Sequence, residues 1–442
     1  MRVRVGRGPS IIIYLAVFLT MMYILTVIGV SDSSPEMIFL IYLFGMLLFL
    51  LLASSGVLRT SNDKILFWGA TFIKVAYSLF RFPMDQITNP LLSNDAWRFW
   101  SIATQYNEGN FSRVYTPFPY ILNIEFHFFG ENVLCFCVTN IILYMLMVLL
   151  VVRLLNKFEI YGKGRFWAVV LSAFLVYGIQ LTSSILRETI YVILITASFY
   201  EYVMYLHTKR QVYLYIAIFL LAPVLVLHIG YFPIVVVYII DIFLHEKIRT
   251  KKEILNRLVI ILAFIVFVLF ASQLNSIGYL TRGQGITGLI NKIVGANSDE
   301  IMGEAGSRYL AGLKITSVPT FILYSPIKWL FYMFSPLPTN WRGLTDIAAF
   351  LLDGCVHFSS LWMSYKYMKR LNRSNKDGKN DLAIRRINAG FWAVVLCGFV
   401  FCLGTSTAGT AIRHRDVMIG IEAFLIGTSF SAYNNDINNG YR

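Results

Sequence analysis

Long apolar runs alternate with short polar segments along almost the whole chain. The first run, residues 11–30, follows a basic N-terminal tail and has the length that a helix needs to cross about 30 Å of hydrocarbon. It is too long for the apolar part of a signal peptide and no cleavage site follows it, so we expect a retained helix. Twelve runs predict transmembrane helices, at about 11–30, 37–55, 65–80, 131–152, 166–182, 184–206, 211–227, 230–244, 258–273, 343–364, 388–405 and 416–430.

A further apolar stretch, residues 319–338, contains four prolines and Lys328. Proline inside a helix removes a backbone hydrogen bond, so this stretch is predicted to be re-entrant or interfacial rather than spanning. Most of the 38 Lys and Arg residues then fall in the termini and in loops on one side of the membrane. Because cytoplasmic loops carry such an excess, both termini are predicted to be cytoplasmic.

The pattern predicts an all-α fold, a polytopic membrane helical bundle with about twelve transmembrane helices, forming a single transmembrane domain over residues 1–442. Two longer segments are predicted to be external. Residues 81–130 form an external loop with an interfacial helix at 118–129, where aromatic residues are frequent. Residues 274–342 form a second external loop followed by the re-entrant segment.

Composition agrees with a membrane protein, because 57% of residues are apolar, 14% are charged and the mean hydropathy is +0.64. A net charge of +14 is explained by the cytoplasmic loops, so nucleic acid is not expected as a partner. The five cysteines lie in apolar runs without metal-ligand spacing, and nucleotide and metalloprotease motifs are absent from the sequence. We therefore expect no cofactor and no metal.

Ionisable residues at the predicted external ends of helices are the candidates for function. In SSILRETIYV, Arg187 and Glu188 are predicted to lie about one turn inside a helix. Neighbouring residues point about 100° apart on a helix, so one can face a polar cavity while the other supports it. The alternative is that the two side chains only extend their charged groups to the membrane surface and have no chemical role.

The segment GTAIRHRD places Arg413, His414 and Arg415 before the last helix. Planar guanidinium groups suit bidentate binding of phosphate oxygens, which predicts an anionic ligand. The alternative is an interfacial anchor that contacts anionic lipid headgroups.

Three other candidates come from external segments. Asp95 lies with Arg98 among aromatic residues and is either a functional carboxylate or a helix N-cap. His228, in the turn LHIGYFP, is either a turn residue or a group that exchanges a proton with a substrate. Arg308 belongs to the glycine-rich external loop, which we expect to cover the site.

Three of these segments together resemble Wzy-type and EpsG-like polysaccharide polymerases: the external segment led by Asp95, then SSILRETIYVILITASFYEYV, then LHIGYFPIVVVYII. The closing GTAIRHRDVM is similar to the Arg-containing C-terminal region of that group. The resemblance implies a glycosyltransferase that polymerises oligosaccharide repeat units carried on undecaprenyl (polyprenyl) diphosphate. The product would be an O-antigen, capsule or other surface polysaccharide, made at the external face of the bacterial plasma membrane.

The same resemblance implies roles for the candidates. Arginines would hold the diphosphate without a metal, and a carboxylate or imidazole would accept the proton of the attacking hydroxyl. The implied partners are the lipid-linked glycan, membrane lipids, a chain-length regulator and a flippase. The implied catalytic residues are Arg187, Glu188, His228 and Asp95, and the implied substrate-binding residues are Arg98, Arg308, Arg413, His414 and Arg415.

Two alternatives stay open from the sequence. A GT-C type glycosyltransferase would also have an acidic, aromatic first external loop, but three helices precede Asp95, which favours the polymerase. A lipid-linked oligosaccharide flippase or other transporter would have ionisable residues near mid-bilayer and two related halves. No internal repeat is evident, and the charges within predicted helices are few: Lys74, Glu201, Asp241, Asp353 and Glu422.

Overall fold

The computed structural model describes residues 34–110, 117–246, 262, 308–310, 317–375 and 380–440. Within these residues every regular element is a helix, which confirms the predicted helical class. The predicted crossings at 11–30 and 258–273 lie outside the described part, as does most of the external loop that begins at 274.

Six helical stretches of the described part are long and apolar enough to cross a membrane. Their length and apolar composition support a helical membrane protein, whereas the twelve crossings and the topology stay predictions. The six are α2 (Pro35–Ser54), α6 (Val133–Lys157), α7 with α8 (Gly162–Phe174 and Val176–Thr182), α9 (Glu188–Thr208), α16 to α17 (Leu344–Ser374) and α18 (Asp381–Gly404).

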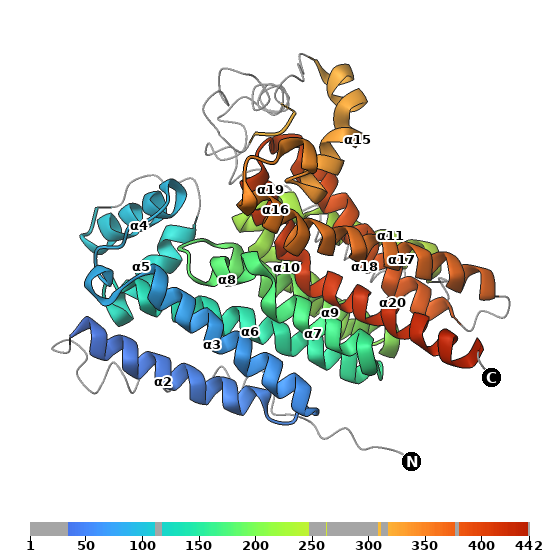
Figure 1. Ribbon diagram of the computed structural model, residues 1–442, viewed down its shortest axis with the longest axis horizontal. Helices are drawn as coiled ribbons and strands as arrows, with labels where there is room; N and C mark the ends of the chain where they lie inside the picture. The colour runs from blue at the N-terminus through green and yellow to red at the C-terminus, as the bar shows by residue number, and fades with distance from the viewer. Residues whose placement is uncertain are drawn as a thin grey trace. The chain divides into compact units, whose positions relative to one another are not determined.

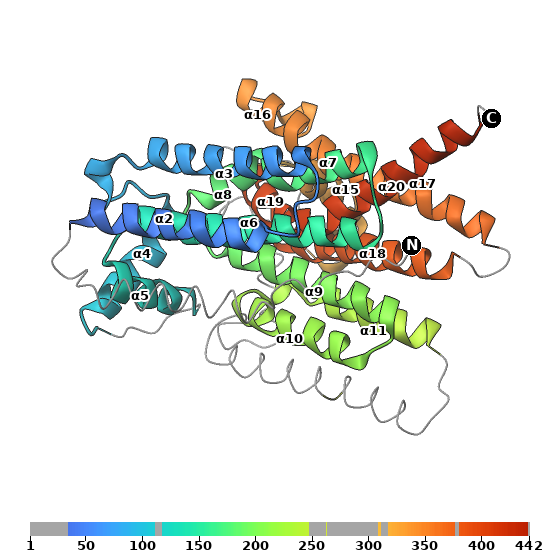
Figure 2. The same ribbon diagram turned by 90° about the horizontal axis from the view of Figure 1, so that it is seen from below.

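The helices form two compact units, residues 1–193 (unit 1) and 194–442 (unit 2), with the division inside α9. In unit 1, α6 packs against α2, α3 (Ser61–Arg81), α7 and α8, and α2, α3 and α6 run alongside one another in Figures 1 and 2. Most of α6 is buried, as expected for a helix that is apolar on all sides. A second pair, α4 (Asn94–Asn107) and α5 (Phe118–Phe129), packs together, and α5 has the bounds predicted for the interfacial helix.

Helix α3 shows how unit 1 accommodates charge. Near its N-terminus, Asp63 completes a capping box with Thr60. The Asp63 carboxylate also accepts hydrogen bonds from the guanidinium of Arg165 in α7, the shortest at 2.6 Å. Lys74, in the middle of the helix, is fully buried, and its Nζ lies 4.2 Å from the centre of the Tyr144 ring. Both side chains thus contact neighbouring helices, Asp63 through an ion pair and Lys74 through an aromatic ring.

Unit 2 is built around α18, which packs against α11 (Pro233–His245), α15 (Val318–Phe334), α17 (Cys355–Ser374) and α20 (Ile419–Gly440). Helices α17, α18 and α20 lie side by side in both views (Figures 1 and 2). The proline-rich stretch predicted to be re-entrant is mainly the single helix α15, which continues through Pro326. Its relation to a membrane stays a prediction.

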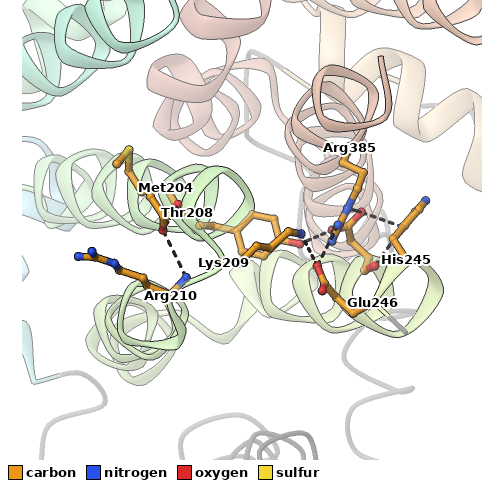
Figure 3. A network of polar contacts seen from close by, with 9 residues as sticks. Met204, Thr208, Lys209, Arg210, His245, Glu246 and Arg385 are labelled. Carbon is orange, nitrogen blue, oxygen red and sulfur yellow. Dashed lines mark hydrogen bonds and ion pairs between the residues drawn. The ribbon is translucent and has the colours of Figure 1, made fainter. Parts of the chain in front are cut away.

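A network of ion pairs joins α9, α11 and α18 in unit 2 (Figure 3). The Arg385 guanidinium donates to Asp241, with the shortest distance 2.8 Å, and to Glu246 at 2.9 Å. The Tyr202 hydroxyl donates to Asp241 at 2.6 Å, and Lys209 pairs with Glu246. We call these five residues the Arg385 network.

Candidate functional site

The first group of predicted site residues lies in unit 1. Arg187 directly precedes α9, which begins at Glu188, so the pair stands at the helix start and not one turn inside it as predicted. The guanidinium carbon of Arg187 lies 5.9 Å from the centre of the Phe99 ring and 6.0 Å from that of Tyr191. Since Phe99 belongs to α4, the fold brings Arg187 beside the helix that carries Asp95.

Asp95 does not cap α4. The N-cap is Ser93, and Asp95 lies within the first turn, so the N-cap alternative is wrong. Asp95 and Arg98 are both exposed on this helix. An acidic residue in the first turn is favoured by the helix dipole, which explains its position whatever its function.

Asn140 holds the chain that leads into Arg187. Its Nδ2 donates to the Ser184 carbonyl at 2.9 Å, and its Oδ1 accepts from the Thr189 hydroxyl. Asn140 is 1% exposed, so both ends of a buried amide are satisfied by the segment on either side of Arg187. We did not single out this residue from the sequence, although an asparagine within the apolar run 131–152 was the available signal.

The second group lies in unit 2 and is centred on the short helix α19 (Ala408–Arg415). The rings of His228, at the end of α10 (Gln211–Leu227), and His414 lie 5.1 Å apart between centres. Phe401 lies against both, at 4.9 Å and 4.7 Å. Two histidines that are distant in sequence are therefore neighbours.

His228 also has the structural role that was its alternative. Its Nδ1 accepts a hydrogen bond from the Gly230 amide at 3.2 Å. Next to it, the Tyr231 hydroxyl donates to the His414 carbonyl at 3.3 Å. These bonds hold the turn between α10 and α11 against α19.

Arg308 reaches the same region through its backbone. It forms an antiparallel bridge with Thr407, the N-cap of α19. The neighbouring Tyr309 donates its amide to the Ser406 carbonyl and its hydroxyl to the Thr405 carbonyl, both at 3.0 Å. Arg308 is thus fixed beside the helix that carries the half-buried Arg413.

Arg415 requires a correction. We predicted that its guanidinium binds a diphosphate, but the side chain is buried, at 2% exposure. Its Nε donates to Asp353 Oδ1 at 3.0 Å, Nη2 donates to the same oxygen, and Nη1 donates to the Tyr332 carbonyl at 3.1 Å. The guanidinium is already engaged by the protein and positions Asp353.

Arg415 belongs to a buried group that the sequence did not reveal. His357 Nδ1 lies 2.7 Å from Glu422 Oε2, and His357 Nε2 lies 2.9 Å from Asp416 Oδ1 and 3.3 Å from Asp353 Oδ1. All five side chains are at most 3% exposed. We call these five residues the His357 cluster. In the sequence, the charges of Asp353 and Glu422 inside apolar runs are the one trace of it.

No family model, curated protein or solved structure matches this chain. The function therefore has to be inferred from the residues themselves. They form one group around Arg187 in unit 1, and in unit 2 they form the α19 group (His228, Arg308, Arg413 and His414) and the His357 cluster.

Proposed function

We propose that the protein is a membrane glycosyltransferase that polymerises polyprenyl-diphosphate-linked oligosaccharide repeat units at the external face of the bacterial plasma membrane. The observation that carries the proposal is the α19 group, in which His228 lies against His414 and the backbone of Arg308 pairs with Thr407, the N-cap of the helix that carries Arg413 and His414. Six apolar helices support the membrane location.

The α19 group has the functional groups that this transfer requires. A bond forms between the acceptor hydroxyl oxygen and the anomeric carbon, while the bond from that carbon to the diphosphate oxygen breaks and its electron pair leaves with the diphosphate. Arg308 and Arg413 supply guanidinium groups for the anionic leaving group. A neutral imidazole can accept the hydroxyl proton, and His414 is the candidate, because Nδ1 of His228 already accepts a hydrogen bond from the Gly230 amide.

Unit 1 offers a surface suited to sugars. On α4, Asp95 and Arg98 are exposed beside Trp97, which is 51% exposed. Aromatic faces flanked by charged hydrogen-bonding groups suit sugar rings and their hydroxyls, since the apolar sugar face packs on the ring. Taken by itself, α4 is therefore a candidate surface for binding sugar.

The test uses a host strain that lacks the gene and carries variants on a plasmid. Arg308→Ala and Arg413→Ala should shift surface glycan from long chains to single repeat units, because each variant removes a positive charge that stabilises the leaving diphosphate. Arg413→Lys should rescue poorly, since lysine lacks the planar fork. Chain length is read from gels of the extracted glycan.

Lys369→Ala is the matched control, because Lys369 is an exposed cation of unit 2 at the far end of α17. It should keep the wild-type chain length. If Arg308→Ala, Arg413→Ala and His414→Ala all keep long chains as well, the proposal is wrong. An incomplete repeat unit would instead indicate the GT-C type transferase.

A second candidate is a transporter of lipid-linked oligosaccharides, and the His357 cluster favours it. The small number of charges within the predicted helices disfavours this function, yet Asp353 and Glu422 belong to one buried polar group. Buried ionisable groups in membrane helices often mark ion or substrate pathways. The same strain test separates the two, because loss of a transporter leaves no exported glycan at all.

A further inference from the structure

The His357 cluster holds more acidic than basic side chains. Asp353, Asp416 and Glu422 contribute three carboxylates, and Arg415 contributes one guanidinium. With all three carboxylates ionised and the imidazole neutral, two negative charges would be uncompensated among buried side chains. Because burying an uncompensated charge is costly, the group needs a further positive charge or protons.

We propose that Asp353, His357 and Asp416 bind a divalent transition metal ion, which would balance both charges. One donor atom from each of the three residues lies within 4.8 Å of the others. Two donors bound at about 2.1 Å to one tetrahedral ion are about 3.4 Å apart. The distances of 2.9 Å and 3.3 Å from His357 Nε2 to the two aspartates are close to that spacing.

Unused carboxylate oxygens are the second observation that points to a ligand. Asp353 Oδ2, Asp416 Oδ2 and Glu422 Oε1 are buried and have no hydrogen-bond partner within the described residues. Buried polar atoms are normally satisfied, so three unsatisfied oxygens in one cluster require an explanation. The free oxygens of the two aspartates belong to the carboxylates that lie next to His357 Nε2.

Glu422 is arranged as a positioning residue for His357. Its Oε2 lies 2.7 Å from Nδ1, so that Nδ1–H can donate a hydrogen bond to Glu422 while the lone pair of Nε2 stays available for a metal ion. Histidines that bind metals commonly donate their other ring nitrogen to a carboxylate in this way. Arg415 similarly holds Oδ1 of Asp353 and leaves Oδ2 open.

The backbone that carries the site is also specialised. Asp353 lies in the π-helical turn Phe350–Gly354, which directly precedes α17. Such turns are rare and occur frequently at functional sites. The turn shifts the register of the chain. Asp353 reaches Arg415, the last residue of α19, and His357, four residues later, reaches Asp416 in the segment between α19 and α20.

The donor set favours first-row transition metals. Imidazole nitrogen is a good ligand for Zn²⁺, whereas two carboxylates also suit Mn²⁺. Three protein ligands leave room for a further ligand on the ion. This inference is independent of the proposed function, which uses the α19 group.

The test measures metal on the full-length protein purified in detergent. After treatment with a chelator and reloading with Zn²⁺ or Mn²⁺, elemental analysis should find about one ion per chain. His357→Gln and Asp416→Asn should reduce bound metal to background. Glu422→Gln should weaken affinity by about 10- to 100-fold while the stoichiometry at saturation is kept, because it changes only the orientation of His357.

His245→Gln is the matched control, since His245 also lies beside an aspartate but belongs to the Arg385 network region. It should retain the ion. Metal content that is unchanged in His357→Gln would overturn the proposal. If the variants do not fold, the wild type still decides: chelator-treated protein must take up Co²⁺, with visible absorption that Zn²⁺ displaces, and a protein that takes up neither ion holds protons there instead.

Discussion

Replacing Arg385 with methionine removes the centre of the Arg385 network and keeps most of the side-chain length. Asp241 is 7% exposed, and its Oδ2 accepts hydrogen bonds from two nitrogens of Arg385, Nη2 at 2.8 Å and Nε at 3.1 Å. In the variant its carboxylate would keep the Tyr202 hydroxyl at 2.6 Å but would lose its counter-charge. We therefore expect unit 2 to become markedly less stable.

The magnitude follows from the burial. Removing one partner of a buried ion pair costs about 3–5 kcal/mol, because the remaining charge is left uncompensated. Because the Tyr202 hydroxyl still donates to Asp241, we expect the cost of the substitution to lie near the lower limit of this range, about 3 kcal/mol. With about 2–4 °C per kcal/mol for a unit of this size, the melting temperature should fall by about 10 °C.

The assay is the thermal melt of the detergent-solubilised protein, followed by tryptophan fluorescence. Adding Asp241→Asn to Arg385→Met should restore much of the loss, because the uncompensated charge is then absent. Arg373→Met, at an exposed position of α17, should melt like the wild type. An Arg385→Met protein as stable as the wild type, or a double variant that loses the sum of both single effects, would refute the reasoning.

Two further predictions concern unit 2. Burial raises the pKa of Glu246, but hydrogen bonds from Lys209 and Arg385 outweigh it, so that the folded-state pKa lies below the ordinary value. This contribution to stability is present above about pH 4.5 and is lost as the pH falls through the folded-state pKa. In melts at several pH values, Glu246→Gln should therefore lose less stability on acidification than the wild type. An identical pH profile would contradict the prediction. Gly420→Ala should destabilise the protein by about 1–3 kcal/mol in the same melts, since its Cβ would collide with the buried side chain of Thr196, and unchanged stability would mean that α20 shifts freely.

Apolar runs were sufficient to predict the helices. The run at 388–405 became α18 (Asp381–Gly404), and the aromatic segment 118–129 became α5 with the same bounds. Helix formation and apolar burial depend mainly on local sequence, so length and hydropathy predict such elements well. Helix starts were less accurate, because the exact first residue depends on local backbone geometry, as with the N-cap of α4, which is Ser93 and not Asp95.

The candidate residues divide in the same way. The sequence indicated that Arg187, His228, Arg308, Arg413 and His414 are chemically unusual in a membrane protein, which requires only their charge and their position relative to apolar runs. It did not indicate their neighbours. The approach of His228 to His414 and the bridge from Arg308 to Thr407 join segments that are far apart in the chain.

Arg415 and His357 show what only the tertiary structure decided. Arg415 has the sequence context of a ligand-binding arginine, yet it is buried on Asp353. His357 has an ordinary helical context in α17, yet it contacts three carboxylates, from the turn before α17, from the segment leading into α20 and from α20 itself. The sequence alone determined which residues carry charge in an apolar chain, because that depends on composition along the chain. Which charges face each other depended on the packing of α17 against α20, because long-range contacts leave no local pattern in the sequence.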